Sequence, residues 1–559
     1  MSHRVLTVAL LTLLLCGPVA GGATALDASA AGVPADGSAL STPAPTLVGL
    51  YPNPHATDDR GEFVVLDVRG GAELGDYRLC DGERCVSLPN RTAETGRVVL
   101  SAAPDRVGNL TDTPVTSLPT PLDLANGGET VRLRRGDTTV STARYEDAPE
   151  GEVYARTTAP GAHPRWTWRP IGSTDRPVVE SGPASVEAFV LPDAPGVPLR
   201  TVESAEERLL LAGYTFSSER VADALVAAHD RGVAVRVLVE GSPVGGTTTR
   251  QAAVLDRLVA AGVEVRAVGG PWARYRFHHA KYAVADNRAL VLTENWKPSG
   301  VGGRSSRGWG AVVDDPTVAE GLADTFRVDW RWRDAVRWAK FRRGRSFVRE
   351  RAANGTFQTR HPPERVRAES VRLLVAPDNA ESGVVGLVDG ANRSLDVLQV
   401  SLGGPDGPFT RALVRAARRG VETRILLSGA WYVREDNRAL ADRLNALADR
   451  EDLPLTVRLA VPGERFGKVH AKGLVVDDRH AVVGSLNFNA HSARENREVV
   501  LVLTGEAVAG YYGDVFAADW KGNDAGPPGG VPVGLVGALG VAGLGAMALA
   551  RGIEFEGGT

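Results

Sequence analysis

An excess of charge of either sign is missing from this chain, and lysine is scarce. Its 64 basic and 67 acidic residues leave a formal net charge of -3 over 559 residues. The chain as a whole is therefore neither a polycation that coats nucleic acid nor a strongly acidic protein, and any charged binding surface must be local. Arginine makes most of the basic surface, and the lysines are Lys281, Lys297, Lys340, Lys468, Lys472 and Lys521.

Cysteine is scarce as well, with three in the whole chain. The sequence has no Cys/His cluster and no HExxH spacing, so we expect neither a metal site nor a cofactor. Cys80 and Cys85 lie on either side of a short Asp-Gly-Glu-Arg turn. Outside the cell such a pair closes a short disulfide, and two unpaired thiols are the alternative.

Both ends of the chain carry apolar runs. Residues 1–25 begin with basic residues, continue with an apolar run and end in Ala23-Thr24-Ala25, which is typical of a secretory signal peptide. Residues 531–550 are apolar or small and are long enough for a transmembrane helix, a removable sorting signal being the alternative. We therefore expect secretion across the cell membrane and anchoring by a C-terminal helix. The bulk of the chain is then extracytoplasmic, with residues 551–559 inside.

A linker over residues 26–45 leads into a region of short β-type runs over residues 46–154. These runs are separated by Gly, Asp, Asn and Pro turns, as a small all-β sandwich requires. The segments Leu47–Pro54 and Leu122–Glu129 resemble signatures of the lamin-tail domain family. The resemblance implies an Ig-like sandwich that serves as a binding or display module.

From residue 179 onward, apolar strand-like runs alternate with amphipathic helical patterns, which predicts α/β sheets covered on both faces. The plan then repeats. Arg231-Gly232-Val233 matches Arg419-Gly420-Val421 at an offset of about 190 residues, which indicates an internal duplication. We place the two halves at residues 179–330 and 368–520, followed by a linker over 521–530.

The second half contains a strand, a turn and a second strand that bring polar groups together. His470 and Lys472 are two residues apart, so their side chains leave one face of an extended backbone. Asp477 opens the turn, and the returning strand ends near Ser485 and Asn487. An imidazole, an ammonium, a hydroxyl and an amide in one place suit an oxyanion.

The first half carries a second copy of this arrangement. His279, Lys281 and Asp286 repeat its spacing, and Thr293 and Asn295 stand where Ser and Asn stand in the other copy. This copy is one residue shorter after Asp286. Thr293 keeps the hydroxyl that the serine position supplies.

The pattern His-x-Lys-x4-Asp, followed by Gly-Ser-x-Asn, resembles the HKD motif of the phospholipase D superfamily. The resemblance implies duplicated α/β sandwich domains whose two motifs meet across a pseudo-two-fold axis, so the halves pair within one chain and need no obligate dimer. Such a site cleaves phosphodiesters through a phosphohistidine and needs no metal. The family's chain order makes His279 the nucleophile and His470 the general acid.

A further carboxylate is implied by the same resemblance. Glu498 stands where family members carry a Glu that orients the motif histidine, whereas the first copy has Arg307-Gly308 there. The two halves are therefore not interchangeable. The candidate catalytic residues are His279, Lys281, Asp286, His470, Lys472, Asp477 and Glu498, and the candidate phosphate-binding residues are Thr293, Asn295, Ser485 and Asn487.

The motif aspartates are a special case within this set. Asp286 and Asp477 are at odd spacing from their histidines, so strand alternation turns them to the other face. We expect them to brace the turn or a partner. His278, beside His279, points to that other face as well and is expected to be structural.

Basic and aromatic residues interleave in a connector over residues 331–367, for example at Trp338, Phe341 and Arg342. Three interpretations are open: the connector grips anionic lipid headgroups, it stacks and pairs with nucleic acid, or it exposes a solvated arginine face.

The sequence predicts a phospholipase D-like phosphodiesterase that cleaves or transfers phosphodiesters, with phospholipids at the outer membrane face as the leading substrate. An extracellular DNA or RNA nuclease of the same chemistry is the first alternative. A non-catalytic surface binding protein with a degenerate site is the second, since the first motif is altered.

Overall fold

The computed structural model describes residues 43–55, 60–157, 165–270 and 272–522. The predicted signal peptide, nearly all of the predicted N-terminal linker and the predicted C-terminal helix with its flanks lie outside these residues. Within the described ranges, no helix is both long enough and apolar enough to cross a membrane.

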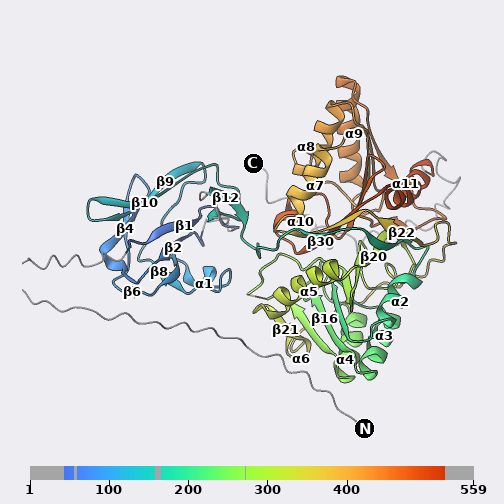
Figure 1. The fold of residues 1–559 in the computed structure, drawn as a ribbon, viewed down its shortest axis with the longest axis horizontal. Coiled ribbons are helices and arrows are strands. Elements are labelled where there is room, and N and C mark those ends of the chain that lie inside the picture. Colours follow the sequence, from blue (N-terminus) through green and yellow to red (C-terminus); the bar gives the residue numbers. More distant parts are fainter. Residues whose placement is uncertain (1–42, 56–59, 158–164, 271, 523–559) are drawn as a thin grey trace, which may run out of the picture. The chain divides into compact units, whose positions relative to one another are not determined.

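The N-terminal region is built from strands (Figure 1). One sheet has the order β12-β11-β1-β2-β7-β8 and another the order β10-β9-β4-β5, while β3 pairs with β6. The bounds are β1 Thr46–Tyr51, β2 Phe63–Val68, β3 Ala72–Glu73, η1 Leu74–Asp76, β4 Tyr77–Cys80, β5 Cys85–Ser87, β6 Thr92–Ala93, β7 Gly96–Ser101, α1 Pro104–Val107, β8 Val115–Ser117, β9 Gly128–Arg135, β10 Thr138–Glu146, β11 Glu152–Thr157 and β12 Arg165–Pro170.

Both of the larger sheets contribute side chains to one apolar core, which includes Leu50, Leu66 and Leu133. The strand-rich prediction for this region is confirmed, although β12 carries the region to Pro170, beyond the expected end at residue 154. Cys80 and Cys85 are joined by a disulfide across the β4–β5 hairpin. The likeness to lamin-tail domains stays a prediction.

The first half contains a ten-stranded sheet, with nine strands in the order β21-β17-β16-β15-β18-β19-β20-β14-β22 and with β27 paired to β20 as the tenth. Strands β15, β16 and β17 are parallel, whereas β18, β19, β20 and β14 run antiparallel to their neighbours. The bounds are β14 Ala184–Leu191, β15 Arg208–Gly213, β16 Ala234–Glu240, β17 Glu264–Val268, β18 Tyr282–Ala285, β19 Arg288–Leu292, β20 Ser306–Asp314, β21 Ala335–Arg337, β22 Glu364–Ala368 and β27 Lys468–Val469.

The second half repeats this plan in an eight-stranded sheet of order β13-β23-β30-β29-β28-β24-β25-β26. Its parallel strands are β24, β25 and β26. The bounds are β13 Val179–Ser181, β23 Ser370–Ala376, β24 Ser394–Gln399, β25 Glu422–Ser428, β26 Leu455–Ala460, β28 Gly473–Val476, β29 His480–Gly484 and β30 Glu498–Thr504.

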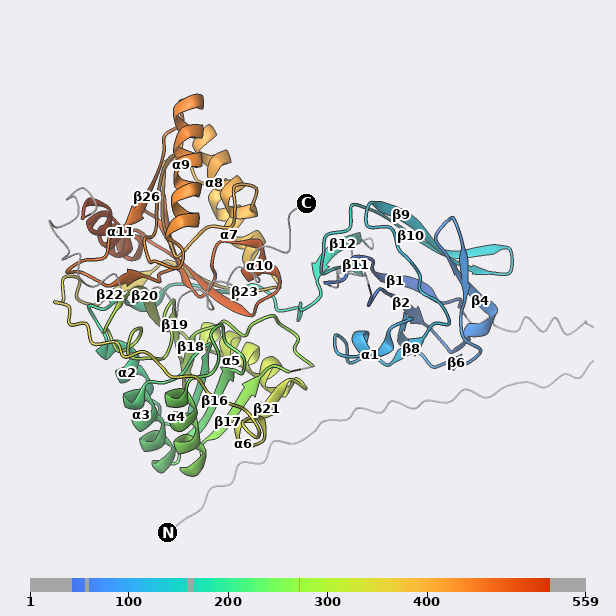
Figure 2. The ribbon, with the colours of Figure 1, turned by 180° about the vertical axis from the view of Figure 1, so that it is seen from behind.

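Helices cover both sheets, as the alternating pattern predicts (Figures 1 and 2). Helices α2, α3, α4 and α6 share a core with the first sheet, and α7, α8, α9 and α10 share one with the second. A third core combines α5, α11 and side chains of both sheets. The bounds are α2 Gly196–Glu203, α3 Glu219–Asp230, α4 Thr249–Ala260, α5 Pro316–Arg331, α6 Trp338–Phe341, α7 Ala380–Asp389, α8 Pro408–Arg418, α9 Arg434–Glu451, α10 Ala490–Arg494 and α11 Glu506–Lys521.

The halves exchange strands, which alters the expected boundaries. Strand β13, expected in the first half, pairs with β23 of the second sheet. The connector, in turn, supplies β21 and β22 to the first sheet. The first half therefore continues past residue 330, because sheet edges recruit whichever extended segment passes beside them.

The connector does not present its aromatic residues to a ligand. Trp332, Trp338 and Phe341 are buried, and the Trp338 indole Nε1 donates to Asp256 Oδ1 at 2.8 Å. Arg342 is exposed and pairs with the same aspartate at 2.9 Å. The interleaved aromatic residues thus belong to the core, which removes the base-stacking interpretation for these three side chains.

Candidate active site

The segment that precedes each motif histidine docks on the other half. The first motif's segment forms a parallel bridge between His278 and Arg497 at the start of β30, and the His279 N–H donates to the Arg497 carbonyl at 3.0 Å. In the second motif, β27 pairs with the start of β20, and the His470 N–H donates to the Arg307 carbonyl at 2.9 Å. Both motifs therefore depend on contact between the halves.

Two buried arginines at corresponding positions fasten these segments. Arg497 contacts Asp329 of the first half at 3.0 Å and Asp378 of its own half at 3.1 Å. Arg307 contacts Asp193 at 2.6 Å and Asp519 of the second half through a 3.2 Å hydrogen bond. Each guanidinium thus has one carboxylate partner in its own half and one in the other half, as buried charges require.

His278 belongs to the same buried network. Its side chain is fully buried, and Nε2 lies 3.2 Å from Asp329 Oδ2. Its backbone N–H donates to Glu240 at the end of β16 at 2.8 Å. His278 therefore braces the motif, as strand alternation predicts.

The motif lysines lie at the carboxyl ends of the parallel strands. Ala212 at the end of β15 pairs with Tyr282 at the start of β18, directly after Lys281. The Lys281 ammonium donates to the His279 carbonyl, and the Lys472 ammonium donates to the His470 carbonyl at 2.8 Å. Burial lowers the pKa of both lysines, to about 8 for Lys472, while the nearby Glu294 and Glu498 carboxylates favour their charged forms.

His279 is held by the carboxylate of Glu498, which belongs to the other half. Its Nδ1 lies 2.9 Å from Oε1 and 3.1 Å from Oε2 of that glutamate. Burial lowers the pKa of His279 to about 4, against the opposing effect of Glu498, so the ring is neutral at neutral pH. Burial alone would raise the pKa of Glu498, but His279 and Lys281 hold it below its usual value.

His470 has a carboxylate beside it as well, and the sequence motif did not indicate it. Its Nδ1 lies 3.4 Å from Oε2 of Glu294, the residue between Thr293 and Asn295. Burial lowers the pKa of His470 well below its usual value, and the Lys472 charge acts in the same direction. Burial raises the pKa of Glu294 to about 7, against the opposing lysine charges.

The phosphate-binding candidates divide into two kinds. Thr293 Oγ1 accepts from the Trp309 N–H at 2.9 Å, and Ser485 Oγ accepts from the Val499 N–H at 3.1 Å, so these hydroxyls fasten strand backbones. Asn295 and Asn487 differ, because the buried Oδ1 of each has no hydrogen-bond partner in the described part of the chain. A donor group on a ligand can satisfy these two oxygens, whereas a phosphate oxygen can be bound only by the Nδ2–H groups of the same amides.

Comparison with known proteins agrees with this geometry. A family model described as the PLD-like domain of cardiolipin synthase matches residues 199–330 and 384–520. The duplicated region belongs to the phospholipase D superfamily. At the level of this family, the matches support a phosphodiesterase.

Individual relatives of this superfamily are distant. Phospholipase D of Rickettsia felis is 26% identical over 150 residues, which are 27% of this chain and 68% of that protein. Mitochondrial cardiolipin hydrolase of Xenopus laevis is 25% identical over 147 residues, covering 26% and 64%. Phosphatidylserine synthase of Haemophilus influenzae Rd KW20 matches in structure with a TM-score of 0.46 and 14% identity, covering 60% of this chain and 87% of that one. The matches span about two thirds of the curated relatives.

The motif aspartates of this phospholipase D-like chain lie in the turns that follow β18 and β28. Asp286 has a positive φ of 54° and accepts the N–H groups of Glu206, Glu207 and Arg208 at 2.8 to 2.9 Å. Asp477 repeats this contact with the N–H groups of residues 392–394. Both carboxylates thus brace the start of a parallel strand, and we correct their inclusion in the catalytic set.

Replacing Asp286 with Ala should lower the free energy of unfolding by about 1–3 kcal/mol, because three backbone donors lose their acceptor. Urea unfolding would measure this change, with Asp230→Ala on the exposed end of α3 as the control. A loss of kcat of more than about tenfold in a folded Asp286→Ala variant would restore the catalytic assignment.

Two further lysines lie near the site and were missed. Lys297 and Lys468 both lower the pKa of His470 and Glu294 through their charges. The Lys468 ammonium lies 5.4 Å from the ring centre of Tyr432. The scarcity of lysine in the chain was the signal that could have pointed to them, because four of its lysines gather here. These charges favour an anionic ligand.

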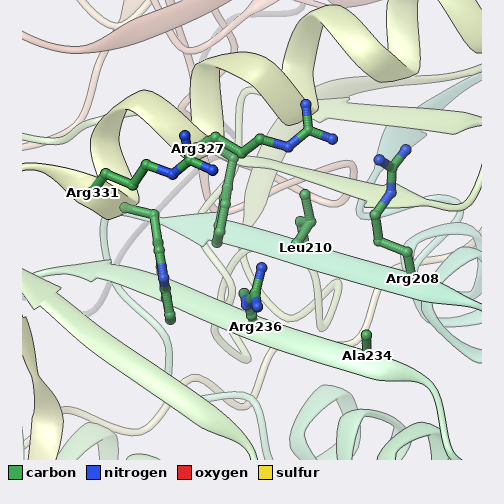
Figure 3. Close-up of a pocket in the computed structure, with 8 residues that line it drawn as sticks. Arg208, Leu210, Ala234, Arg236, Arg327 and Arg331 are labelled. Atoms are coloured by element: carbon green, nitrogen blue, oxygen red, sulfur yellow. The ribbon is translucent and has the colours of Figure 1, made fainter.

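An arginine-rich cavity elsewhere is separate from this site (Figure 3). It measures about 220 Å³ and is lined by Arg208, Arg236, Arg327 and the Trp330 ring, among others. Arg208 and Ala234 begin β15 and β16, so the cavity lies at the opposite strand ends from the motif histidines. Arg208 and Arg327 share Glu320, Arg327 also pairs with Asp324, and Arg236 pairs with Glu264.

No metal site emerges from the geometry. Within the part of the chain that the structure describes, no group of three or more His, Cys, Asp or Glu side chains could hold a metal ion.

Proposed function

We propose that this protein is a phosphodiesterase that cleaves phospholipids through a phosphohistidine on His279. One observation carries the proposal: each half contributes a histidine, a buried lysine and an asparagine with an unpartnered Oδ1, and a carboxylate of the other half lies at each histidine Nδ1. A degenerate binding protein would have no reason to keep both sets.

The first step forms the covalent bond. Glu498 holds His279 as the tautomer with Nδ1–H, which leaves the Nε2 lone pair to attack phosphorus. The P–O bond to the leaving alcohol breaks, and the proton on His470 Nε2 passes to the leaving oxygen. The lysines and the asparagine amides stabilise the charge on the non-bridging oxygens.

The second step reverses these roles. Water attacks the phosphohistidine and gives its proton to His470, the P–N bond breaks, and His279 returns to its neutral form. An alcohol in place of water gives transfer instead of hydrolysis. Neither step needs a metal ion.

Two exposed aromatic residues at the rim of the site, Trp431 and Tyr432, favour a phospholipid over nucleic acid as the substrate. Trp431 follows β25 and keeps 60% of its surface exposed, and the adjacent Tyr432 is 43% exposed. Leu398 of β24 pairs with Gly473, next to Lys472, and β25 runs parallel to β24 with Leu427 opposite Gln399. The loop that follows β25 therefore lies at the same sheet edge as the motif lysine. Apolar rings beside lysine charges suit an anionic bilayer, in which aromatic residues prefer the interface. Relatives named for phospholipid or cardiolipin cleavage add to this preference.

Separate incubations of the protein with vesicles that contain anionic phospholipid and with plasmid DNA would distinguish the two substrates. We expect release of headgroup alcohol from the vesicles. Cleavage of DNA with intact lipid would replace the lipid proposal by the nuclease alternative, and cleavage of neither would overturn the proposed function.

Replacing Trp431 with Ala should weaken cleavage of vesicles about tenfold, because the exposed part of the ring no longer enters the interface. Hydrolysis of a short-chain, fully soluble phospholipid should fall far less. An equal loss on both substrates would assign Trp431 to the reaction site and leave the rim without a role in lipid docking.

A further inference from the structure

The two halves place their carboxylates at different positions in the chain. In the second half, Glu498 begins β30 and Leu486 lies between Ser485 and Asn487. In the first half, Gly308 occupies the position that corresponds to Glu498, and Glu294 occupies the position of Leu486. Each half thus has a carboxylate, but Glu498 stands at the start of β30, whereas Glu294 stands just after the end of β19.

Space at Gly308 is filled by Glu294. A Cβ added to Gly308 would lie 2.2 Å from Cγ and 2.8 Å from Oε1 of Glu294. Both distances are below any real contact, so a side chain at 308 and the present position of Glu294 exclude one another. The glycine is therefore required by the glutamate that lies over it.

The Glu294 side chain is aimed at the reaction site. It is 1% exposed, and its Oε2 lies 3.4 Å from Nδ1 of His470. Its Oε1 is buried without a hydrogen-bond partner in the described residues. The Lys472 ammonium lies 3.3 Å from the same His470 Nδ1, and its charge opposes the rise that burial causes in the pKa of Glu294. A buried carboxylate is costly unless such charges offset it.

We propose that Glu294 is the positioning residue for His470 and takes over, from a different strand end, the task that Glu498 performs for His279. The inference rests on the proposed function, since it assigns a residue to one step of it. Glu294 accepts Nδ1–H of His470, which keeps the proton that reaches the leaving group on Nε2. Its negative charge stabilises the imidazolium before transfer.

Glu498 and Glu294 differ in proton affinity, and this difference suits the different roles of the two histidines that they contact. Glu498 is held ionised by His279 and Lys281, which suits a nucleophile that must stay neutral with a fixed tautomer. Burial raises the pKa of Glu294 to about 7, so this carboxyl group takes up a proton more readily than Glu498 does. Burial and the Lys472 charge lower the pKa of His470, and an ionised Glu294 beside Nδ1 opposes that shift and favours the imidazolium.

The test compares two diesters with different leaving groups, because a general acid speeds the reaction only when the departing oxygen needs a proton. Glu294→Gln keeps the shape of the side chain and removes its charge. We expect this variant to lower kcat on a short-chain phosphatidylcholine by about 10²–10⁴-fold, with KM little changed. Release of p-nitrophenol from bis(p-nitrophenyl) phosphate in the first turnover should fall less than about tenfold, because this phenolate leaves unprotonated.

Glu498→Gln is the matched control. It acts on the nucleophile and should slow the first turnover of both diesters. If Glu294→Gln slowed both diesters equally, the inference would fail while the proposed function stood. If the native protein turned over neither diester, the proposed function would fail first and the inference with it.

Moving the glutamate from position 294 to position 308 gives a second, independent test. Glu294→Leu and Gly308→Glu each reproduce one feature of the second half and should each lower activity, the latter by crowding. The double variant recreates the arrangement of Leu486 and Glu498, and we expect at least tenfold recovery over Glu294→Leu. Thermal unfolding would establish that each variant folds. A folded double variant without recovery would overturn the inference.

Discussion

Replacing either motif histidine with alanine should lower kcat on phospholipid by at least about 10⁴-fold. The reason is that nucleophile and acid act as one unit: His279 forms the covalent bond, and His470 supplies and removes the proton. The double variant should be no less active than either single variant, since the losses do not add. Headgroup release in the steady state would measure all three.

His229 provides the control for these variants, because it lies on α3 away from the motifs. His229→Ala should keep wild-type kcat. A single variant at His279 or His470 that retained near wild-type turnover would contradict the two-histidine site, provided that the vesicle substrate is the one the native protein cleaves.

Breaking the Arg497 pair should destabilise the protein more than any other substitution considered. Asp329→Ala leaves the Arg497 guanidinium buried with a partner missing, which typically costs about 3–5 kcal/mol. His278 and the Tyr275 hydroxyl, both in contact with Asp329, lose a partner as well. Urea unfolding monitored by tryptophan fluorescence would give the change in midpoint and slope.

The pH dependence of this effect has a definite sign. Burial alone would raise the pKa of Asp329, but Arg497 and His278 hold it below its usual value. The contribution is therefore complete above the unfolded pKa of about 4 and is lost as pH falls below it. Arg418→Ala, which breaks an exposed pair with Glu451, should change stability little. Equal changes in the two variants would contradict the role of the buried cluster.

Spacing and alternation were enough to predict much of the fold. The duplicated α/β plan follows from buried strand runs and amphipathic helices that repeat along the chain, and period-two alternation turned His278 and Asp286 away from the reaction face. These patterns are local. They carry no information on which half a side chain reaches, so sequence reasoning did not anticipate that Glu498 contacts His279 in the other half.

Glu294 escaped the sequence analysis for a related reason. The motif allows any residue between Thr293 and Asn295, so its identity carried no signal, and the absence of Glu at Gly308 was interpreted as a departure in the first copy. Only the three-dimensional contact with His470 connects the two positions. The pairing of β13 with the second sheet and of the connector strand β22 with the first was missed, because tertiary structure sets the partners of short edge strands.

The central claim is that His279 carries the phosphoryl group, and trapping it tests that claim most directly. Native protein would be mixed with bis(p-nitrophenyl) phosphate, quenched in alkali during the first turnover, digested and mapped by mass spectrometry. We expect the phosphoryl adduct on the peptide that contains His279, in an amount that matches the burst of p-nitrophenol. An adduct on His470, or full turnover with no adduct on either histidine, would contradict the mechanism.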